Sequence, residues 1–169
     1  MLKSTLGIAI AFSLCAVAHA ANQGQGVVNF KGTVIDAPCG IAPESADQTI
    51  DFGQISKSLL TAGGISKAQD LDIKLVNCDT SKVTKGVTLT FSGNTVNGVT
   101  ELETAGPTNT AIVINGYGSD ITFGQPTDNI KLTNGDNTLR FQSWVKQAST
   151  KTAAEGDFTA VANFNLAYE

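Results

Sequence analysis

The stretch Gly156-Asp-Phe-Thr-Ala-Val-Ala-Asn-Phe-Asn-Leu-Ala-Tyr-Glu169 decides the fold of this chain. Its apolar and polar residues largely alternate, and the side chains of an extended strand point to opposite faces with a period of two. One face carries Phe158, Ala160, Ala162, Phe164, Leu166 and Tyr168. The pattern predicts a half-buried strand. The outer edge of such a strand has N–H and C=O groups that need a covering partner.

The rest of the sequence also favours an all-β fold, because it consists of short alternating or β-branched runs that end in turn residues. The predicted strands are residues 27–35, 48–52, 71–77, 87–91, 111–114, 120–123, 129–132, 138–146 and 158–168. Turns are expected at Asn97-Gly98, Asn115-Gly116 and Asn134-Gly135. Residues 55–62 could form one or two helical turns. This spacing of strands is typical of an immunoglobulin-like β-sandwich.

Residues 1–20 are predicted to be a signal peptide. A short basic start precedes the apolar run of residues 6–17, and Ala18-His19-Ala20 has small residues where a signal peptidase cleaves. The run of about a dozen residues is too short to cross a hydrocarbon layer of roughly 30 Å. We therefore expect export to an oxidising compartment, cleavage after Ala20 and no membrane insertion.

Removal of residues 1–20 leaves 149 residues, of which 10 are basic and 15 acidic. This acidic balance argues against nucleic acid and anionic lipid as partners. The only histidine, His19, leaves with the signal peptide, which excludes a Ser-His-Asp triad and a histidine-ligated metal site from the mature chain. We expect neither enzymatic activity nor a cofactor.

Two patterns could carry chemistry but have simpler interpretations. Asp70 and Asp72 share one face of a strand, a spacing that occasionally binds calcium or serves acid–base catalysis. We expect them to be the solvated face of that strand. Trp144 breaks the alternation set by Leu139 and Phe141, which indicates a bulge or a core position, with sugar stacking as the alternative.

Two cysteines remain in the mature chain, Cys39 and Cys78. In an exported protein such a pair is most simply one disulfide, with two free buried thiols as the alternative. Closing a loop of about 40 residues would stabilise the fold by about 4 kcal/mol on the chain-entropy model.

The mature N-terminus begins with a polar, glycine-containing lead, residues 22–26, that has little to anchor it. It continues into a stretch in which Val28, Phe30, Gly32 and Val34 share one face. A strand with a loose lead can pack away from its own domain. The alternatives are a first strand packed in its own domain and, for Gly32, an ordinary bulge glycine.

Together these residues resemble the pilin subunits of Gram-negative chaperone-usher fimbriae, most closely the major rod subunits of the P pilus and type 1 pilus kind. The resemblance covers essentially the whole mature chain. It is carried by Gly32-Thr-Val-Ile-Asp-Ala-Pro-Cys39, Gln48-Thr-Ile-Asp-Phe-Gly-Gln54, residues 70–78 and Ala160-Val-Ala-Asn-Phe-Asn-Leu-Ala-Tyr168. The family's penultimate tyrosine and its glycine fourteenth from the end correspond to Tyr168 and Gly156.

The resemblance implies an incomplete immunoglobulin-like β-sandwich that lacks its last strand. A periplasmic chaperone would lend a strand to the groove beside the terminal strand, where Gly156, Phe158, Ala160, Ala162, Phe164, Leu166 and Tyr168 would form the binding segment. An outer-membrane usher would then replace it with the N-terminal extension of the next subunit, a form of β-augmentation. The donor residues would be Val28, Phe30, Gly32 and Val34.

The expected organisation is a signal peptide in residues 1–20, a donor-strand extension in residues 21–35 and a pilin domain in residues 36–169. Identical subunits would join head to tail, and with other fimbrial subunits, into a surface fimbrium that supports attachment and biofilm growth. The alternatives are a minor adaptor or terminating pilin and a self-contained secreted β-sandwich that binds a small ligand.

Overall fold

The structure is a computed structural model that describes residues 26–96 and 98–169. The expected signal peptide, residues 21–25 of the extension and Asn97 of one expected turn lie outside this part. The chain divides into a unit that ends at Val34 and a unit from Ile35 to Glu169, which are described separately. Among the described residues, no helix combines the length and the hydropathy needed to cross a membrane.

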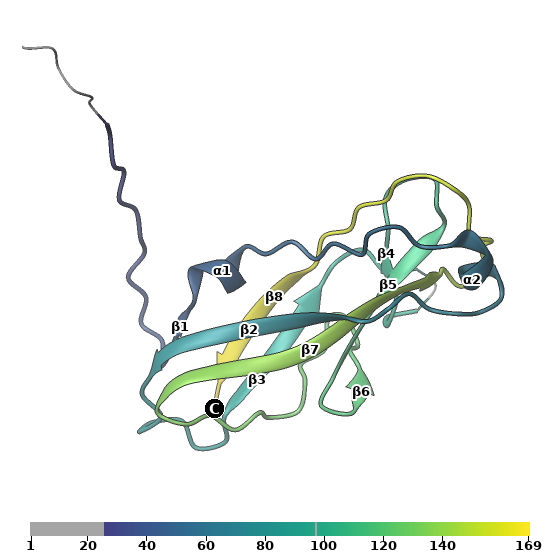
Figure 1. The fold of residues 1–169 in the computed structure, drawn as a ribbon. Helices are drawn as coiled ribbons and strands as arrows, with labels where there is room; N and C mark the ends of the chain where they lie inside the picture. Colours follow the sequence, from purple (N-terminus) through teal and green to yellow (C-terminus); the bar gives the residue numbers. More distant parts are fainter. Residues whose placement is uncertain (1–25, 97) are drawn as a thin grey trace, which may run out of the picture. The chain divides into compact units, whose positions relative to one another are not determined.

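The larger sheet of the unit 35–169 has β2 (Gln69–Cys78) and β7 (Gly135–Gln147) at its centre. β1 (Gly40–Ile41) pairs with β2, while β5 (Thr110–Gly116) continues the sheet beyond β7 and pairs with β4 (Leu102–Glu103) and β6 (Ser119–Asp120). Every pair is antiparallel. Figure 1 shows β2 and β7 running side by side along the unit.

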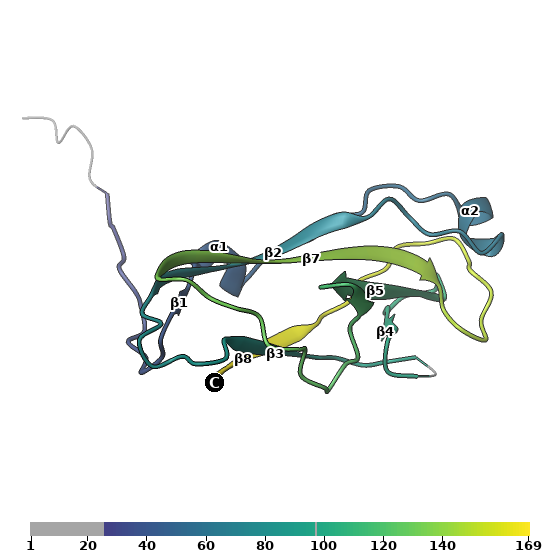
Figure 2. The same ribbon diagram turned by 90° about the horizontal axis from the view of Figure 1, so that it is seen from below.

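The second sheet consists of β3 (Val87–Ser92) and β8 (Asn163–Tyr168), which are also antiparallel. Figure 2 shows β3 and β8 as a layer facing the layer of β2, β7 and β5, so the predicted two-layer β-sandwich is confirmed. Between the layers lies a core whose largest fully buried side chains are Phe141, Ile73, Leu75, Leu89, Leu139, Val87 and Val145.

Two short helices lie outside the sheets. α2 (Lys57–Thr61) confirms the one or two helical turns expected in residues 55–62, whereas α1 (Pro43–Ala46) was not expected from the sequence. α1 starts at a proline, whose fixed φ suits the first turn of a helix. The buried Ser45 ties it to β2, since the Ser45 hydroxyl accepts a hydrogen bond from the Lys74 backbone N–H at 2.9 Å.

The interpretation of Trp144 as a bulge was wrong. β7 keeps a continuous register against β5 from Gln147 to Gln142, opposite residues 110–115. The alternation set by Leu139 and Phe141 continues through a buried Ser143, so Trp144 is half-buried on the opposite face of β7. Asp70 and Asp72 lie on β2 as expected, where Ile73 and Leu75 are fully buried.

The turn expected at Asn115-Gly116 was also wrong, because both residues belong to β5. The turn lies one step later, at Tyr117 and Gly118, with φ values of 55° and 91°. Gly116 instead permits close packing, since a Cβ there would lie 2.2 Å from a ring carbon of Phe141.

Residues 129–132 are not a strand. This part of the chain reaches β3 through one backbone hydrogen bond from Gly124 N–H to Phe91 C=O and one from Thr127 N–H to Leu89 C=O. Ile130 and Val87 exchange a reciprocal pair. Successive bonded residues are three apart in this segment but two apart in β3, so a regular ladder cannot form. The strand expected in residues 120–123 is likewise reduced to β6, although Ile121 and Phe123 are buried.

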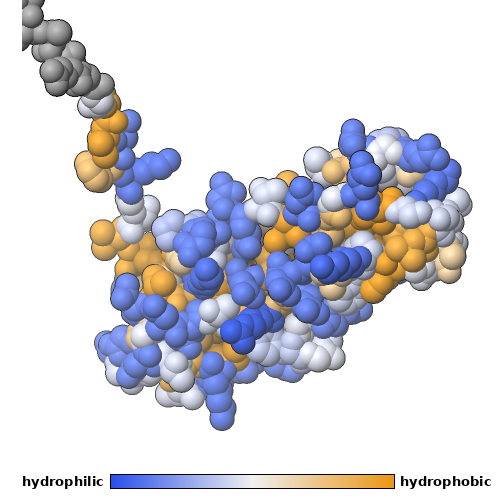
Figure 3. Space-filling model, in the orientation of Figure 1, coloured by the Kyte–Doolittle hydropathy of each residue, from blue (hydrophilic) through white to orange (hydrophobic). Residues whose placement is uncertain are grey.

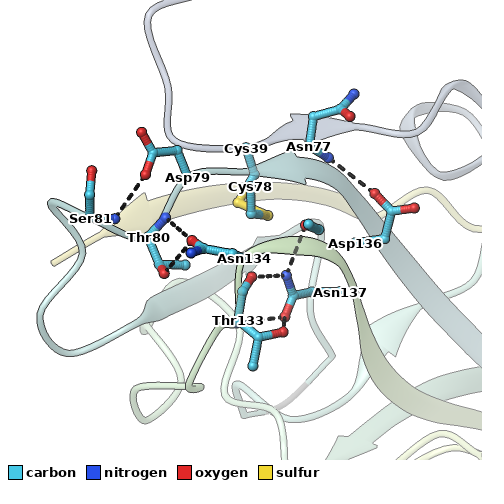
Figure 4. Close-up of a disulfide and its surroundings, with 11 residues drawn as sticks. Cys39, Asn77, Cys78, Asp79, Thr80, Ser81, Thr133, Asn134, Asp136 and Asn137 are labelled. Carbon is cyan, nitrogen blue, oxygen red and sulfur yellow. Dashed lines mark hydrogen bonds between the residues drawn. A yellow bond between two sulfur atoms is a disulfide. The ribbon is translucent and has the colours of Figure 1, made fainter.

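The expected disulfide is present: Cys39 is bonded to Cys78 across a sequence separation of 39 residues. It joins the segment before β1 to the end of β2. Figure 4 shows the loops beside it held by side-chain hydrogen bonds, among them Asp136 accepting from the Asn77 backbone N–H and Asn134 from that of Thr80.

Candidate functional site

An open groove runs between two stretches of chain that lie mostly outside the two sheets. One wall is residues 45–52 and the other is residues 158–164, of which only the last two lie in β8. The strand predicted over residues 48–52 was therefore wrong, and the strand predicted over residues 158–168 forms only from Asn163 onward, apart from one bridge between Thr159 and Ala105. The physical reason is the same for both: a strand needs a paired neighbour, and each segment borders the vacant space of about 620 Å³ between them.

The floor of the open groove is apolar and belongs to the core. It is lined by Leu71, Phe91, Leu102, Ile112, Ile114 and Ser143. In Figure 3, hydrophobic atoms show between hydrophilic side chains on the surface of the unit 35–169. An apolar groove in the surface of a folded protein is a candidate binding site.

A second hollow, the end pocket, continues the open groove toward α2. It has a volume of about 700 Å³ and shares Ile50, Asp51, Phe52 and Phe158 with the open groove. Leu60 and Ile55 also line it, and both belong to a small cluster around the fully buried Val145.

The terminal segment presents the face that the sequence predicted. Exposure alternates without interruption from Phe158 to Glu169, and the inward residues are only half-buried. Ala160, Ala162, Phe164, Leu166 and Tyr168 pack on the main core from one side. Burial raises the pKa of the Tyr168 hydroxyl. Within the described residues β8 pairs with β3 alone, so its other edge is free for a further strand.

Gly156 precedes the terminal segment and lines the end pocket. Its φ is 139°, and a Cβ would lie 2.5 Å from Pro107. The position therefore requires glycine both for its backbone conformation and for space. The neighbouring Gly106 has φ 112°, and a Cβ there would lie 2.3 Å from the Asp157 carbonyl oxygen.

The N-terminal unit, where the structure describes it, is an extended backbone in residues 26–34 without an assigned strand. The strand expected over residues 27–35 is therefore not formed within the chain. The side chains of Val28, Phe30 and Val34 are 73%, 90% and 101% exposed. A Cβ on Gly32 would meet nothing within 4 Å.

The sequence pattern identified one wall of the open groove but missed the other wall and the floor. Residues 48–52 were interpreted as an ordinary strand, and the buried Ser143 was not singled out. A signal for the second wall did exist, since residues 48–54 are part of the family resemblance. Only the fold brings Ser143 next to residues 158–164.

A two-sheet sandwich with an apolar groove between two segments that lie mostly outside its sheets defines the class of an incomplete, immunoglobulin-like β-sandwich. The fimbrial protein family matches residues 28–169, and the chain belongs to this family. It is 48% identical to the Pap fimbrial major pilin protein of Escherichia coli over the full length of both chains. It is 44% identical to the Fimbria A protein of Serratia marcescens, over 99% of this chain and 98% of that protein.

Solved structures agree with the sequence relationships. A chain in the structure of a chaperone-usher pilus is 52% identical, with a TM-score of 0.82, over 87% of this chain and 97% of that chain. The P pilus rod subunit PapA is 49% identical, with a TM-score of 0.74, over 79% of this chain and all of that one. The protein is thus a structural major pilin that polymerises with other pilin subunits into a fimbrium on the cell surface.

Proposed function

We propose that this pilin polymerises by donor-strand exchange, in which the N-terminal extension of one subunit fills the open groove of the next. Val28, Phe30, Gly32 and Val34 are the residues that enter the groove, and residues 158–168 form the edge to which the donor strand bonds. The role of the chain in this scheme is structural.

The observation that supports this proposal best is the open groove itself. Core side chains line the groove between residues 45–52 and residues 158–164, and these two segments form no assigned strand before Asn163. An added strand would gain main-chain hydrogen bonds from one edge and apolar burial from the floor. Each buried Val or Phe side chain contributes about 1.5–3 kcal/mol.

The described part of the extension has the complementary pattern. Three large apolar side chains occupy alternate positions and are exposed to solvent, as an unassembled donor strand requires. Since the donor of each copy serves the groove of another copy, the contact repeats head to tail without closing and the product is a filament.

A periplasmic chaperone and an outer-membrane usher are the partners that the groove implies before assembly. An exposed apolar groove with an unpaired β edge is prone to aggregate, so a chaperone must cover it by lending a strand of its own. The usher then exchanges that strand for the extension of the next subunit. Minor fimbrial subunits join the same filament by the same contact.

Deletion of residues 21–35 from the exported chain tests the proposal. In a strain that lacks the native copy, we expect the deleted chain to form no surface filaments by electron microscopy. It should still accumulate in the periplasm bound to the chaperone, because its groove is intact. Filaments at normal yield would contradict the donor role, and an unchanged monomer for both forms would favour a self-contained secreted protein.

A further inference from the structure

The charged side chains around the two hollows are mostly acidic. In the part of the chain that the structure describes, the charged residues that line the open groove or the end pocket are Asp47, Asp51, Lys57, Glu155 and Asp157. All of them are exposed. Lys57 contacts Glu155, with Nζ and Oε1 3.4 Å apart, so these two charges largely offset each other. The carboxylates of Asp47, Asp51 and Asp157 remain in this set, above an apolar floor.

The proposed donor segment has the opposite charge. Residues 21–35 contain one lysine, Lys31, and no acidic residue, whereas all 15 acidic residues of the chain lie in residues 36–169. Two copies of the mature chain therefore repel each other as whole molecules at neutral pH. The extension of one copy is attracted to the acidic body of the other.

Lys31 points away from the groove floor when the donor strand is seated. Its neighbours Phe30 and Gly32 belong to the inward face of the proposed donor, so Lys31 lies on the outward face. A lysine at such a position keeps its ammonium group in water while its stem lies along the protein surface. The charge of Lys31 is therefore held at the mouth of the groove.

The wall formed by residues 45–52 supplies carboxylates on the same outward side. Its exposure alternates, since the odd-numbered residues of 47–51 are exposed and the even-numbered residues of 48–52 are partly buried. Asp47 and Asp51 therefore share the outward side of this wall, and we call this pair the acidic rim. Four residues of extended chain span about 13 Å, so one lysine placed between the two carboxylates can reach either.

The contacts along the groove place Lys31 between these two carboxylates. Phe52 packs against Phe158 with ring centroids 6.4 Å apart, and Figure 1 shows the chain from α1 to α2 running opposite to the terminal segment. An antiparallel donor with four inward residues matches the four inward residues of the terminal segment that line the groove, which are Phe158, Ala160, Ala162 and Phe164. Lys31 then lies opposite Val161, three residues after Phe158. Three residues before Phe52 is Thr49, which is midway between Asp47 and Asp51.

We propose that Lys31 guides the donor strand into the groove by pairing with the acidic rim, which thereby selects a basic donor. This inference rests on the donor-strand function proposed above. Attraction between exposed charges mainly raises the rate of association and is screened by salt. The apolar inward contacts set how long the donor stays bound. Lys31 is thus a specificity residue that lies outside the apolar contact.

The test measures the association of donor peptides with the full-length chain carrying Val28→Ser and Phe30→Ser, which weaken its own donor without adding charge. The peptides span residues 21–35 with blocked ends, so that Lys31 is their only charge. In stopped-flow fluorescence anisotropy at about 10 mM salt, the Lys31→Gln peptide should associate about fivefold more slowly, while Lys31→Arg keeps the native rate. At about 1 M salt, where the screening length is about 3 Å, the rates should converge. Dissociation rates should change less than about twofold.

Charge changes in the groove give the complementary result. Asp47→Asn with Asp51→Asn should remove the difference between the native and Lys31→Gln peptides, and Asp47→Lys with Asp51→Lys should make a Lys31→Glu peptide the fastest. Asp70→Asn with Asp72→Asn is the matched control, because it removes the same charge from the solvent-facing side of β2 and should preserve the difference.

The outcomes separate the two proposals. Equal association rates for all peptides at low salt, or differences that persist unchanged at high salt, would overturn the role of Lys31 while the donor assignment stands. Binding of no peptide to any form of the groove would overturn the donor assignment as well.

Discussion

Phe91 of β3 and Phe141 of β7 meet edge to face across the sandwich, with ring planes 79° apart. This contact joins the two sheets directly beneath the open groove, whose floor includes Phe91. We predict that Phe141→Ala lowers the free energy of unfolding by about 3–5 kcal/mol, the usual cost of deleting a buried phenylalanine. Urea unfolding checks this, and a loss below about 1 kcal/mol would contradict the assigned packing.

Phe30→Asp should abolish filament assembly while the chain still binds its chaperone. A carboxylate in an apolar groove carries a large desolvation cost, whereas the groove of the variant is unchanged. Electron microscopy of cells and co-purification with the chaperone measure the two effects. Asn29→Asp places the same charge on the opposite face of the extension and should still assemble; equal loss in both variants would refute the assignment of faces.

Tyr168→Ala should lower the periplasmic level of the subunit. Tyr168 pairs with Val87 at the end of β8 and packs on the main core, so its loss weakens the terminal strand, to which the proposed chaperone binds. Immunoblots of periplasmic extracts give the measurement. Asn165→Ala alters the exposed face of the same strand and serves as the control, and normal levels of both variants would argue against the terminal-strand role.

Glu101 should make the fold sensitive to acid. It is 7% exposed, and its carboxylate accepts hydrogen bonds from Lys146 Nζ at 2.6 Å and from Ser149. Burial alone would raise the pKa of Glu101, but the hydrogen bonds from Lys146 and Ser149 and the charge of Lys146 outweigh it, so its pKa lies below the model-compound value of 4.5.

Because the pKa is lowered in the folded state, Glu101 stabilises the protein above the pKa of the unfolded chain, and this stabilisation is lost as the pH falls through the folded-state pKa. Glu101→Gln should therefore be less stable than the wild type at about pH 7, with the difference shrinking below about pH 4.5. Urea unfolding at several pH values tests this. A constant difference at all pH values would mean that the charge of Glu101 contributes nothing.

Loss of the disulfide through Cys39→Ser with Cys78→Ser should cost about 4 kcal/mol on the chain-entropy model. Thermal unfolding with and without reductant checks the value. The double variant should be insensitive to reductant, while the wild type should unfold at a lower temperature when reduced. Equal unfolding temperatures for the reduced and oxidised wild type would contradict this contribution.

The alternation in residues 158–168 was enough to predict the inward face of the terminal segment, since burial follows the side-chain period even where no ladder forms. The same pattern could not predict where β8 begins. A strand boundary depends on a paired neighbour, and the space beside residues 158–162 is vacant. Residues 48–52 were assigned wrongly for this reason.

Other differences came from contacts that only the fold creates. Asn115-Gly116 has a strong turn signal, but the packing of Phe141 on Gly116 keeps both residues in β5. Ser143 had no signal in the sequence, because its place in the floor of the groove depends on segments that are far apart in the chain. The paired cysteines, by contrast, could be predicted from composition and expected export alone.

The disulfide also sets how tension would pass through a filament. A pull on the extension reaches Cys39 first, and without the bond to Cys78 it would peel β1, which is held to β2 by two residue pairs. The cross-link carries the load straight to Cys78, past the loop that residues 40–77 form. Residues 40–77 are thereby removed from the load-bearing path, and a stretched subunit cannot lengthen by unravelling them.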